Sequence, residues 1–309
     1  MAETLTRPPA APPPRRRVSR RRVLVRRFVA LAVLLVFLGA AAWAAVAGIG
    51  GVKDKVAPPP PPPAAPPPPK PLKVIFPEGF TRREMAERVA AVKQIAAEKR
   101  KKKTRISEAA YLKLTERSAL PGRFAEDGKP RDLEGFLFPA TYEFLPRTTT
   151  KQLVNKQLTA FRRGWAKLDL GYAKSKNLTP YDVLIIASMV EKETLAPEER
   201  PLVAAVIYNR LKAGMPLGID ATIRYGLNVP GTESLRQSHL ANPTPYNTRL
   251  HAGLPPTPIA NPGLASLQAA SHPRNVDYLF FARKPDKVHH FFTADEDEFL
   301  QYLAEHGYG

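Results

Sequence analysis

The chain has 309 residues, of which 47 are lysine or arginine and 28 are aspartate or glutamate, so its formal charge is +19. The absence of cysteine excludes a disulfide scaffold, a thiol nucleophile and metal sites with cysteine ligands. The charge argues against an ordinary acidic cytosolic enzyme, and 34 prolines are roughly twice the usual share.

An arginine-rich segment precedes a long uncharged run. Eight arginines lie between Arg15 and Arg27, and residues 28–52 carry no charge. As a helix this run reaches ~37 Å, which is enough to cross a bilayer. Arginines and lysines that flank a membrane span are usually on its cytoplasmic side. We therefore expect a cytoplasmic tail (1–27), one helix spanning the cell (inner) membrane (28–52) and an extracytoplasmic remainder. A cleaved signal peptide and a nucleic-acid-binding arm are the alternatives, but the run is long for a signal peptide and membrane topology already explains the arginines.

A proline-rich segment follows, over residues 53–71. Its two runs of consecutive prolines, Pro58–Pro63 and Pro66–Pro69, favour polyproline II, which rises ~3.1 Å per residue and forms no core. We expect a semi-rigid linker of at most ~45 Å. Such a linker fits a domain that acts on a cell wall held away from the membrane, and a solvated linker without a distance requirement has the same composition.

Residues 72–130 are expected to form a small module followed by a basic segment. The pattern predicts a strand over 73–76, a turn, and a helix with Thr81 as its cap and apolar positions at Met85, Val89 and Val92. One such unit is too small to be stable alone. A basic cluster runs from Lys99 to Arg105, and it either attracts an anionic polymer or forms a solvated helix end.

The segment 133–144 is rich in aromatic residues around an internal proline, which favours an extended or irregular stretch with one solvated face. Its carboxylates, Glu134 and Glu143, alternate with rings that could stack on the faces of sugars. Glu134 is therefore a candidate sugar-binding residue. An ordinary β core has the same composition.

Two helices are predicted over residues 181–212. The first is apolar almost all round at 183–190, as in a core helix, and runs directly into Glu191-Lys192-Glu193-Thr194. The second extends over about 198–212, with Gly214 as its stop. The two helices are expected to form an αα hairpin with both carboxylates near its turn.

A carboxyl at the edge of an apolar core has its pKa raised by desolvation and can donate a proton to a leaving oxygen near neutral pH, as in the cleavage of a glycosidic bond. Helix phase favours Glu193, which continues the line of Ile186 and Val190, whereas Glu191 points away from that line. The alternative is an exposed helix end whose carboxylates pair with Lys192, Arg200 or Arg210.

Polar residues collect in the last third of the chain, among glycines and prolines that fix irregular loops. Ordered loops of this kind often carry function, and the candidates are Asp220, Tyr246, Asn247, Thr248 and Asn261. The asparagines can bind sugar hydroxyl or acetamido groups, or they can form turns beside proline. His289 and His290 are not expected to hold a metal, because neighbours on a strand face opposite sides and no third ligand has suitable spacing.

Six motifs follow one another over roughly residues 72–305: LEGFLFP from Leu133, ASMVEKET from Ala187, YNRL from Tyr208, PYNT from Pro245, GLPP from Gly253 and IANPG from Ile259. Together they resemble the endolytic murein transglycosylase, or YceG-like, family. The resemblance implies an α+β fold with a mixed α+β lytic transglycosylase domain, here residues 131–309, behind a single membrane anchor. No cofactor and no metal are expected.

The resemblance also implies the reaction. The family cuts nascent peptidoglycan within the glycan strand, between N-acetylmuramic acid (MurNAc) and N-acetylglucosamine (GlcNAc), and leaves a 1,6-anhydromuramyl end. Its essential carboxylate lies in the Glu-Lys-Glu-Thr motif, whose second glutamate is Glu193 here. The expected substrate-binding residues are Glu191, Glu134, Asp220, Tyr246, Asn247, Thr248 and Asn261.

Two features depart from the family's pattern. A LysM-like module precedes the catalytic domain in the family, and residues 74–92 resemble only its second part, so a truncated module is expected. Gly218 and Ala221 stand where the family usually has glutamine and proline, so any substrate contact carried by that glutamine is absent.

The expected partners are peptidoglycan strands, the membrane and peptidoglycan synthases, whose strand elongation the cleavage would end. No nucleic acid is expected. Two other functions stay open: a catalytically silent wall-binding scaffold that recruits synthases, and an extracytoplasmic protein that binds polyanions. The second rests on the net charge of +9 of residues 72–309 and on the cluster at 99–105.

Overall fold

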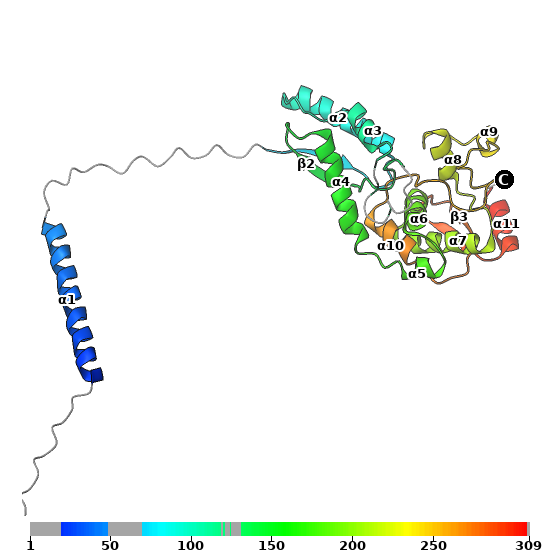
Figure 1. Cartoon of the computed structure of the whole chain (residues 1–309). Helices are drawn as coiled ribbons and strands as arrows, with labels where there is room; N and C mark the ends of the chain where they lie inside the picture. The colour runs from blue at the N-terminus through cyan, green and yellow to red at the C-terminus, as the bar shows by residue number, and fades with distance from the viewer. Residues whose placement is uncertain (1–19, 49–69, 119, 121–123, 125–130, 308–309) are drawn as a thin grey trace, which may run out of the picture. The chain divides into compact units, whose positions relative to one another are not determined.

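The structure is a computed structural model that describes residues 20–48, 70–118, 120, 124 and 131–307 (Figure 1). The chain divides into two units, Met1–Pro67 and Pro68–Gly309. Most of the predicted tail at 1–27 and nearly all of the predicted linker at 53–71 lie outside the described residues.

The described part of the first unit is one helix, α1, from Arg20 to Gly48. It begins eight residues before the predicted span at 28–52 and therefore includes five arginines, whereas residues 49–52 lie outside the described part. Among the residues that the structure describes, no helix combines the length and the apolar character needed to cross a membrane. The structure thus gives no support to the predicted membrane-spanning helix.

The second unit has the mixed α+β architecture predicted from the sequence. It opens with β1 (Leu72–Phe76), α2 (Arg82–Arg100), α3 (Glu108–Thr115) and β2 (Ala140–Phe144). The two strands pair in antiparallel register, and the first residue of β1 lies opposite the last residue of β2. This pairing joins the two sides of the predicted domain boundary at residue 130 in one sheet.

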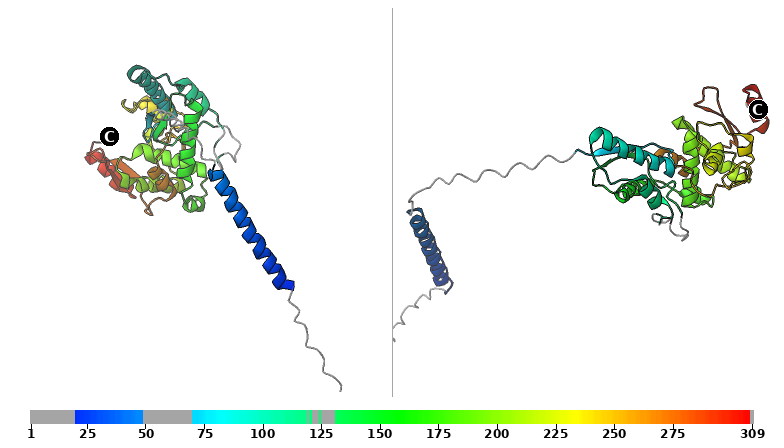
Figure 2. Two further views of the ribbon diagram at one scale, coloured as in Figure 1. Left: turned by 90° about the vertical axis from the view of Figure 1, so that its left-hand side faces the viewer. Right: turned by 90° about the horizontal axis from the view of Figure 1, so that it is seen from above.

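Alternation and capping explain this first part of the unit. Val74 and Phe76 of β1 are buried and alternate with the exposed Lys73 and Ile75. Thr81 and Glu84 form a capping box, in which the Glu84 carboxylate accepts from the Thr81 amide at 2.7 Å. Met85 is fully buried, and α3 packs against α2 (cyan in Figure 1 and Figure 2). The strand, the cap and the helix are confirmed as predicted.

The core is built around α6 (Pro180–Glu193), in which residues 183–190 are all buried. α7 (Arg200–Ala213) follows and ends at Gly214, whose φ of 68° is readily adopted by glycine. α10 (Leu264–Ser271) packs against both helices. The predicted αα hairpin is confirmed.

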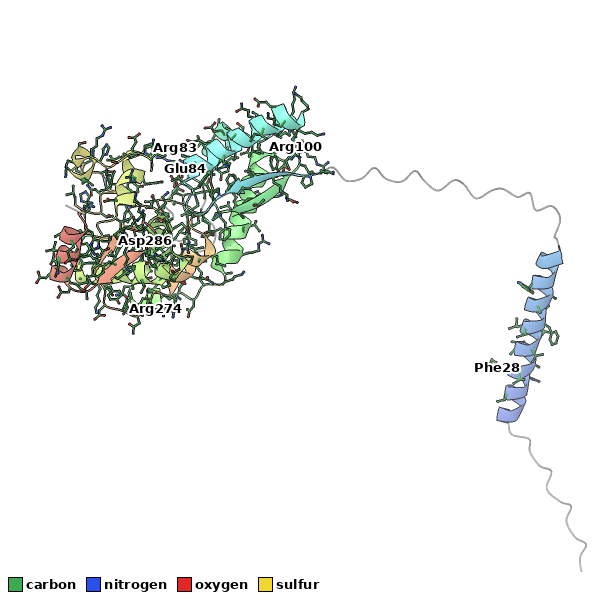
Figure 3. All side chains as sticks on the ribbon, turned by 180° about the vertical axis from the view of Figure 1, so that it is seen from behind. Phe28, Arg83, Glu84, Arg100, Arg274 and Asp286 are labelled. Carbon is green, nitrogen blue, oxygen red and sulfur yellow. The ribbon has the colours of Figure 1, made fainter. Side chains whose placement is uncertain are left out.

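The remaining elements surround this core. They are α4 (Thr150–Trp165), α5 (Gly171–Ser175), the 3-10 helix η2 (Pro197–Glu199), α8 (Asp220–Leu227), α9 (Gln237–Leu240), β3 (Phe280–Arg283), β4 (His290–Thr293) and α11 (Glu296–Glu305). β3 and β4 form a second antiparallel pair, with Asp286 in the turn between them (Figure 3).

A buried carboxyl, that of Glu134, joins several segments of the second unit. Glu134 is only 2% exposed. It accepts hydrogen bonds from the Arg82 amide at 2.9 and 3.1 Å, from Asn261 Nδ2 at 2.7 Å and from the Tyr225 hydroxyl at 3.2 Å. Asn261 also accepts from the Leu137 amide at 2.9 Å. The network therefore ties the start of α2 to α8 and to the loop before α10.

The same burial changes the acidity of this group. Desolvation, helped by the nearby Asp132 carboxylate, raises the pKa of Glu134 to about 8. Hydrogen bonds from the Arg82 amide and the Tyr225 hydroxyl act in the opposite direction. The folded chain consequently holds a proton at Glu134 more tightly than the unfolded chain, in which the carboxyl has its ordinary pKa of 4.5.

This difference predicts a pH-dependent stability. The contribution of Glu134 is fully present below pH ~4.5 and is lost as the pH rises to about 8. We expect the free energy of unfolding of the wild type to fall over this window relative to Glu134→Gln. The fall should amount to a few kcal/mol, because one pKa unit corresponds to about 1.4 kcal/mol. Urea unfolding across the window measures it, with the exposed Glu98→Gln as the control. Parallel curves for the wild type and Glu134→Gln would contradict this assignment.

Candidate active site

The site begins where α6 ends. Glu193 is the last residue of this helix, and Thr194 leaves the helical conformation while its hydroxyl and amide both donate to the Val190 carbonyl, at 2.6 and 3.1 Å. Two residues apart on a helix point about 200° apart. Glu191 and Glu193 therefore project from opposite sides of α6, as the sequence pattern predicts.

Glu193 is partly buried and faces the beginning of α8. The Ala221 amide donates a hydrogen bond to its carboxylate, and the Asp220 carboxylate is close enough to act on its charge. From β3, the Arg283 guanidinium donates to the Glu193 carbonyl oxygen at 3.5 Å. Groups distant in the sequence thus surround one carboxyl.

These neighbours tune the acidity of Glu193. Burial, together with the negative charge of Asp220, raises its pKa to about 7. The Arg283 cation, the Ala221 hydrogen bond and Lys192 all act in the opposite direction. Near neutral pH both the acid and the carboxylate are populated, which suits a group that first donates and then accepts a proton.

Asp220 is held in place by a cation. Its Oδ1 accepts from Arg249 Nε at 2.8 Å and from Arg249 Nη2 at 2.7 Å. Both side chains are 46% exposed, so they are accessible to a ligand. Asp220 is also the first residue of α8, where the helix dipole favours a negative charge.

Asn247 and Thr248 build the loop that supports this pair. Both are buried, and Asn247 donates to the carbonyls of Leu240 and Asn242 at 2.8 Å each while it accepts from the Arg249 amide at 3.1 Å. The Thr248 hydroxyl accepts from the Ile219 amide at 3.0 Å. We assign both residues to the framework of the site, because their polar atoms are used internally.

Three other predicted site residues are also engaged within the fold. Glu134 and Asn261 are buried and bonded to each other. Tyr246 is partly buried, shares a hydrogen bond of 2.8 Å with the Thr257 hydroxyl and packs its ring against Tyr225. The structure thus places Glu134 and Asn261 beneath the surface, where a sugar cannot reach them.

Glu191 has a structural role: its carboxylate binds groups of the protein itself, which is the alternative that the sequence left open for both carboxylates. Its Oε2 accepts from the Gly263 amide at 2.9 Å, and its Oε1 lies 4.0 Å from Arg200 Nη2. Its side chain is 6% exposed. Glu191 therefore fastens α6 to the start of α10 on the side away from Glu193.

The two adjacent histidines differ in their surroundings, as the strand pattern predicts. His290 is 3% exposed, and its Nδ1 lies 2.6 Å from the Glu199 carboxylate. His289 is partly exposed, and its Nδ1 lies 2.9 Å from the Asp286 carboxylate. The His290 contact joins β4 to η2, which begins four residues after Glu193, and so fixes the hairpin that carries Arg283.

Arg283 and Arg249 were not predicted from the sequence. Arg283 is 90 residues beyond Glu193, and no local pattern marks it. Arg249 directly follows the PYNT motif, so extending that motif by one residue would have found it.

Known proteins are similar to this chain in sequence and fold. The family model described as the YceG-like family matches residues 64–305. A crystal structure of a YceG-like protein from Listeria monocytogenes is similar with a TM-score of 0.61 and 27% identity, over 75% of this chain and 76% of that chain.

The curated relatives that match the chain are named endolytic murein transglycosylases. The endolytic murein transglycosylase of Streptococcus pneumoniae R6 is 33% identical over 245 residues, which cover 74% of this chain and 44% of that protein. The endolytic murein transglycosylase of Bacillus subtilis 168 is 37% identical over 174 residues, 56% of this chain and 46% of that protein. The matched regions span less than half the length of either relative. Because the family model covers most of the chain, the chain belongs to the YceG-like family.

Proposed function

We propose that the chain is a lytic transglycosylase that cleaves the bond between MurNAc and GlcNAc within nascent peptidoglycan strands. The observation that carries the proposal is the position of Glu193 at the end of a buried helix, with a pKa of about 7. The curated relatives named endolytic murein transglycosylases support the same reaction class.

In the proposed reaction, Glu193 acts first as an acid and then as a base. Its carboxyl proton passes to the glycosidic oxygen as the bond from that oxygen to C1 of MurNAc breaks. The 6-hydroxyl oxygen of the same MurNAc then bonds to C1, and its proton returns to the Glu193 carboxylate. No water is consumed, so a second carboxylate to activate water is not needed, unlike in glycoside hydrolases.

The neighbouring charges have separate roles in this proposal. Burial is the main cause of the raised pKa of Glu193; the Asp220 charge raises it further, and the Arg283 charge lowers it. Arg249 fixes Asp220, and the loop built by Asn247 and Thr248 fixes Arg249. Asp220 and Arg283, which act on the charge of Glu193, and Arg249, which binds Asp220, are also accessible polar groups suited to bind sugar hydroxyl, acetamido or lactyl groups.

The first prediction concerns the product. Incubation of uncrosslinked glycan strands with the purified chain should give 1,6-anhydromuramyl ends, detected by mass spectrometry. Glu193→Gln should lower the rate at least ~100-fold, because it removes the only proton donor of the proposed reaction. Glu191→Gln is the matched control, since it lies in the same motif, keeps an acceptor for the Gly263 amide and should retain most activity.

Other products would change the conclusion. Reducing ends in place of anhydro ends would show a hydrolase and would require a second carboxylate. Folded wild-type protein that leaves strands intact, when an authentic lytic transglycosylase cuts them, would favour a non-catalytic scaffold.

The second prediction concerns pH. Because Glu193 must be protonated to start the reaction, the rate should fall as the pH rises through about 7. Asp220→Asn should move this fall to lower pH, and Arg283→Gln should move it to higher pH, each by roughly 1 pH unit. The rate profiles of the three proteins test this expectation. Displacement of both variants in the same direction would refute the assigned electrostatic roles.

The location and the partners belong to the same proposal. A cell-membrane location with an extracytoplasmic catalytic domain is supported by the arginine cluster before the uncharged residues 28–52. Cleavage there would end the elongation of strands, next to the synthases that make them. Membrane fractionation and protease treatment of intact spheroplasts test the location. We expect the chain in the membrane fraction, with residues 72–309 digested from outside. A fully soluble chain would refute the anchor.

A further inference from the structure

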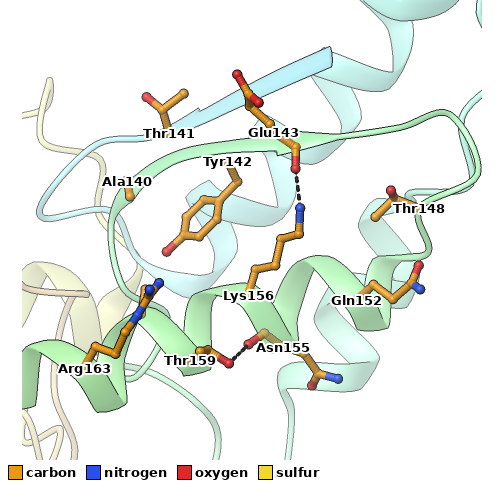
Figure 4. Close-up of a pocket in the computed structure, with 11 residues that line it drawn as sticks. Ala140, Thr141, Tyr142, Glu143, Thr148, Gln152, Asn155, Lys156, Thr159 and Arg163 are labelled. Carbon is orange, nitrogen blue, oxygen red and sulfur yellow. Dashed lines mark hydrogen bonds between the residues drawn. The ribbon is translucent and has the colours of Figure 1, made fainter. Parts of the chain in front are cut away.

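A groove lies between β2 and α4, on residues that the proposed active site does not use. Its volume is about 720 Å³ (Figure 4). Tyr142 and Ala140 contribute from the strand, whereas Gln152, Asn155 and Arg163 contribute from the helix. The lining surface is mainly apolar but includes polar side chains from both elements, and no part of the proposed reaction accounts for it.

The groove meets β2 at its edge. Four consecutive residues of this strand, 140–143, line it, whereas the face of a strand would contribute alternate residues. The Glu143 carbonyl points away from β1 and accepts from Lys156 Nζ of α4 (Figure 4). The amides and carbonyls of Thr141 and Glu143 therefore face the groove, because residues two apart on a strand share a direction.

This edge of β2 has no strand partner among the described residues, in which β2 pairs with β1 alone. An open edge presents a row of backbone donors and acceptors that another extended chain can pair with. The contact from Lys156 satisfies one of these acceptors by a long side chain, which an added strand could displace.

The charge of the groove is positive. Its one carboxylate, Glu143, is paired with Lys73 at 3.3 Å on β1. Lys156 and Arg163, in contrast, make no ion pair within the described part of the chain. α4 carries no acidic residue at all. A ligand in the groove would therefore meet two cations without counterions.

The length of the groove limits the size of the ligand. From Gln152 to Arg163 the helix rises ~16 Å. An extended peptide rises about 3.3 Å per residue, so about five residues span this distance.

We propose that this groove binds an extended acidic segment of a protein partner, which adds to β2 as a third strand. Backbone groups of Thr141 and Glu143 pair with the segment, and two of its acidic side chains, two positions apart on one face, reach Lys156 and Arg163. Lys156 exchanges its contact with the Glu143 carbonyl for a carboxylate of the partner. The site is independent of the proposed glycan cleavage, since it shares no residue with it.

The test uses the full chain and a synthetic probe, acetyl-Val-Glu-Val-Glu-Val-amide. Titration calorimetry should show binding, and backbone-amide NMR should show the largest shifts at Thr141 and Glu143. The same peptide with both glutamates replaced by glutamine should bind at least ~10-fold more weakly, because it lacks the charges that meet the two cations.

Matched variants locate the contact. Arg163→Glu should weaken binding of the acidic peptide at least ~10-fold. Arg162→Glu is its control, because Arg162 is the preceding residue of the same helix turn, is exposed and does not line the groove. Both variants carry the same change in net charge. A difference between their affinities for the peptide would therefore come from contacts in the groove and not from the overall charge of the protein.

Several results would overturn the proposal. They are equal binding of the glutamine peptide, equal effects of the two variants, or amide shifts that avoid Thr141 and Glu143. Binding of chitopentaose in the groove with no binding of either peptide would identify a sugar site instead. The NMR measurement on the wild type decides even if a variant folds poorly.

Discussion

The burial of one carboxyl, that of Glu134, is the constraint on which the arrangement of the second unit depends. A carboxyl removed from water needs hydrogen-bond partners, and leaving it without them costs several kcal/mol. Its partners come from the start of α2, from α8 and from the loop before α10. These segments must therefore meet at one point. Because α8 also points its first residues at Glu193, the position of the proposed catalytic group is coupled to the packing of α2.

The proposed active site balances opposite charges over a short distance. A carboxyl that serves as both acid and base works best with a pKa near the working pH. Burial makes the largest contribution to the raised pKa of Glu193. At Glu193 the anion Asp220 and the cation Arg283 oppose each other. Each is fixed by a separate device: Arg249 and its loop hold Asp220, and the buried contact between His290 and Glu199 holds the hairpin of Arg283. Asn247, Thr248 and His290 thus serve to hold these two charges in place.

The features that the sequence predicts correctly are those that depend on interactions between residues close together in the chain. The cap at Thr81, the buried helix at 183–190 and the stop at Gly214 all follow from near neighbours. Glu134 was placed in a sugar site because the sequence cannot tell an exposed carboxylate from a buried one whose partner, Asn261, is 127 residues away. The small module was expected to lack its first half, yet the strand that completes its sheet lies downstream, at 140–144. Arg283 was missed for the same reason, because only the packed hairpin brings this residue to Glu193.

The pairing of β1 with β2 also determines which segment of this chain can be exchanged as a unit. The strands enclose α2 and α3 between them in sequence, and β2 leads directly toward α4 and the core. A segment swap that ended before residue 140 would import one strand without its partner, and a fragment that began after residue 76 would leave both edges of β2 open to association with other chains. Recombination can therefore replace this module intact only at junctions before residue 72 and after residue 144.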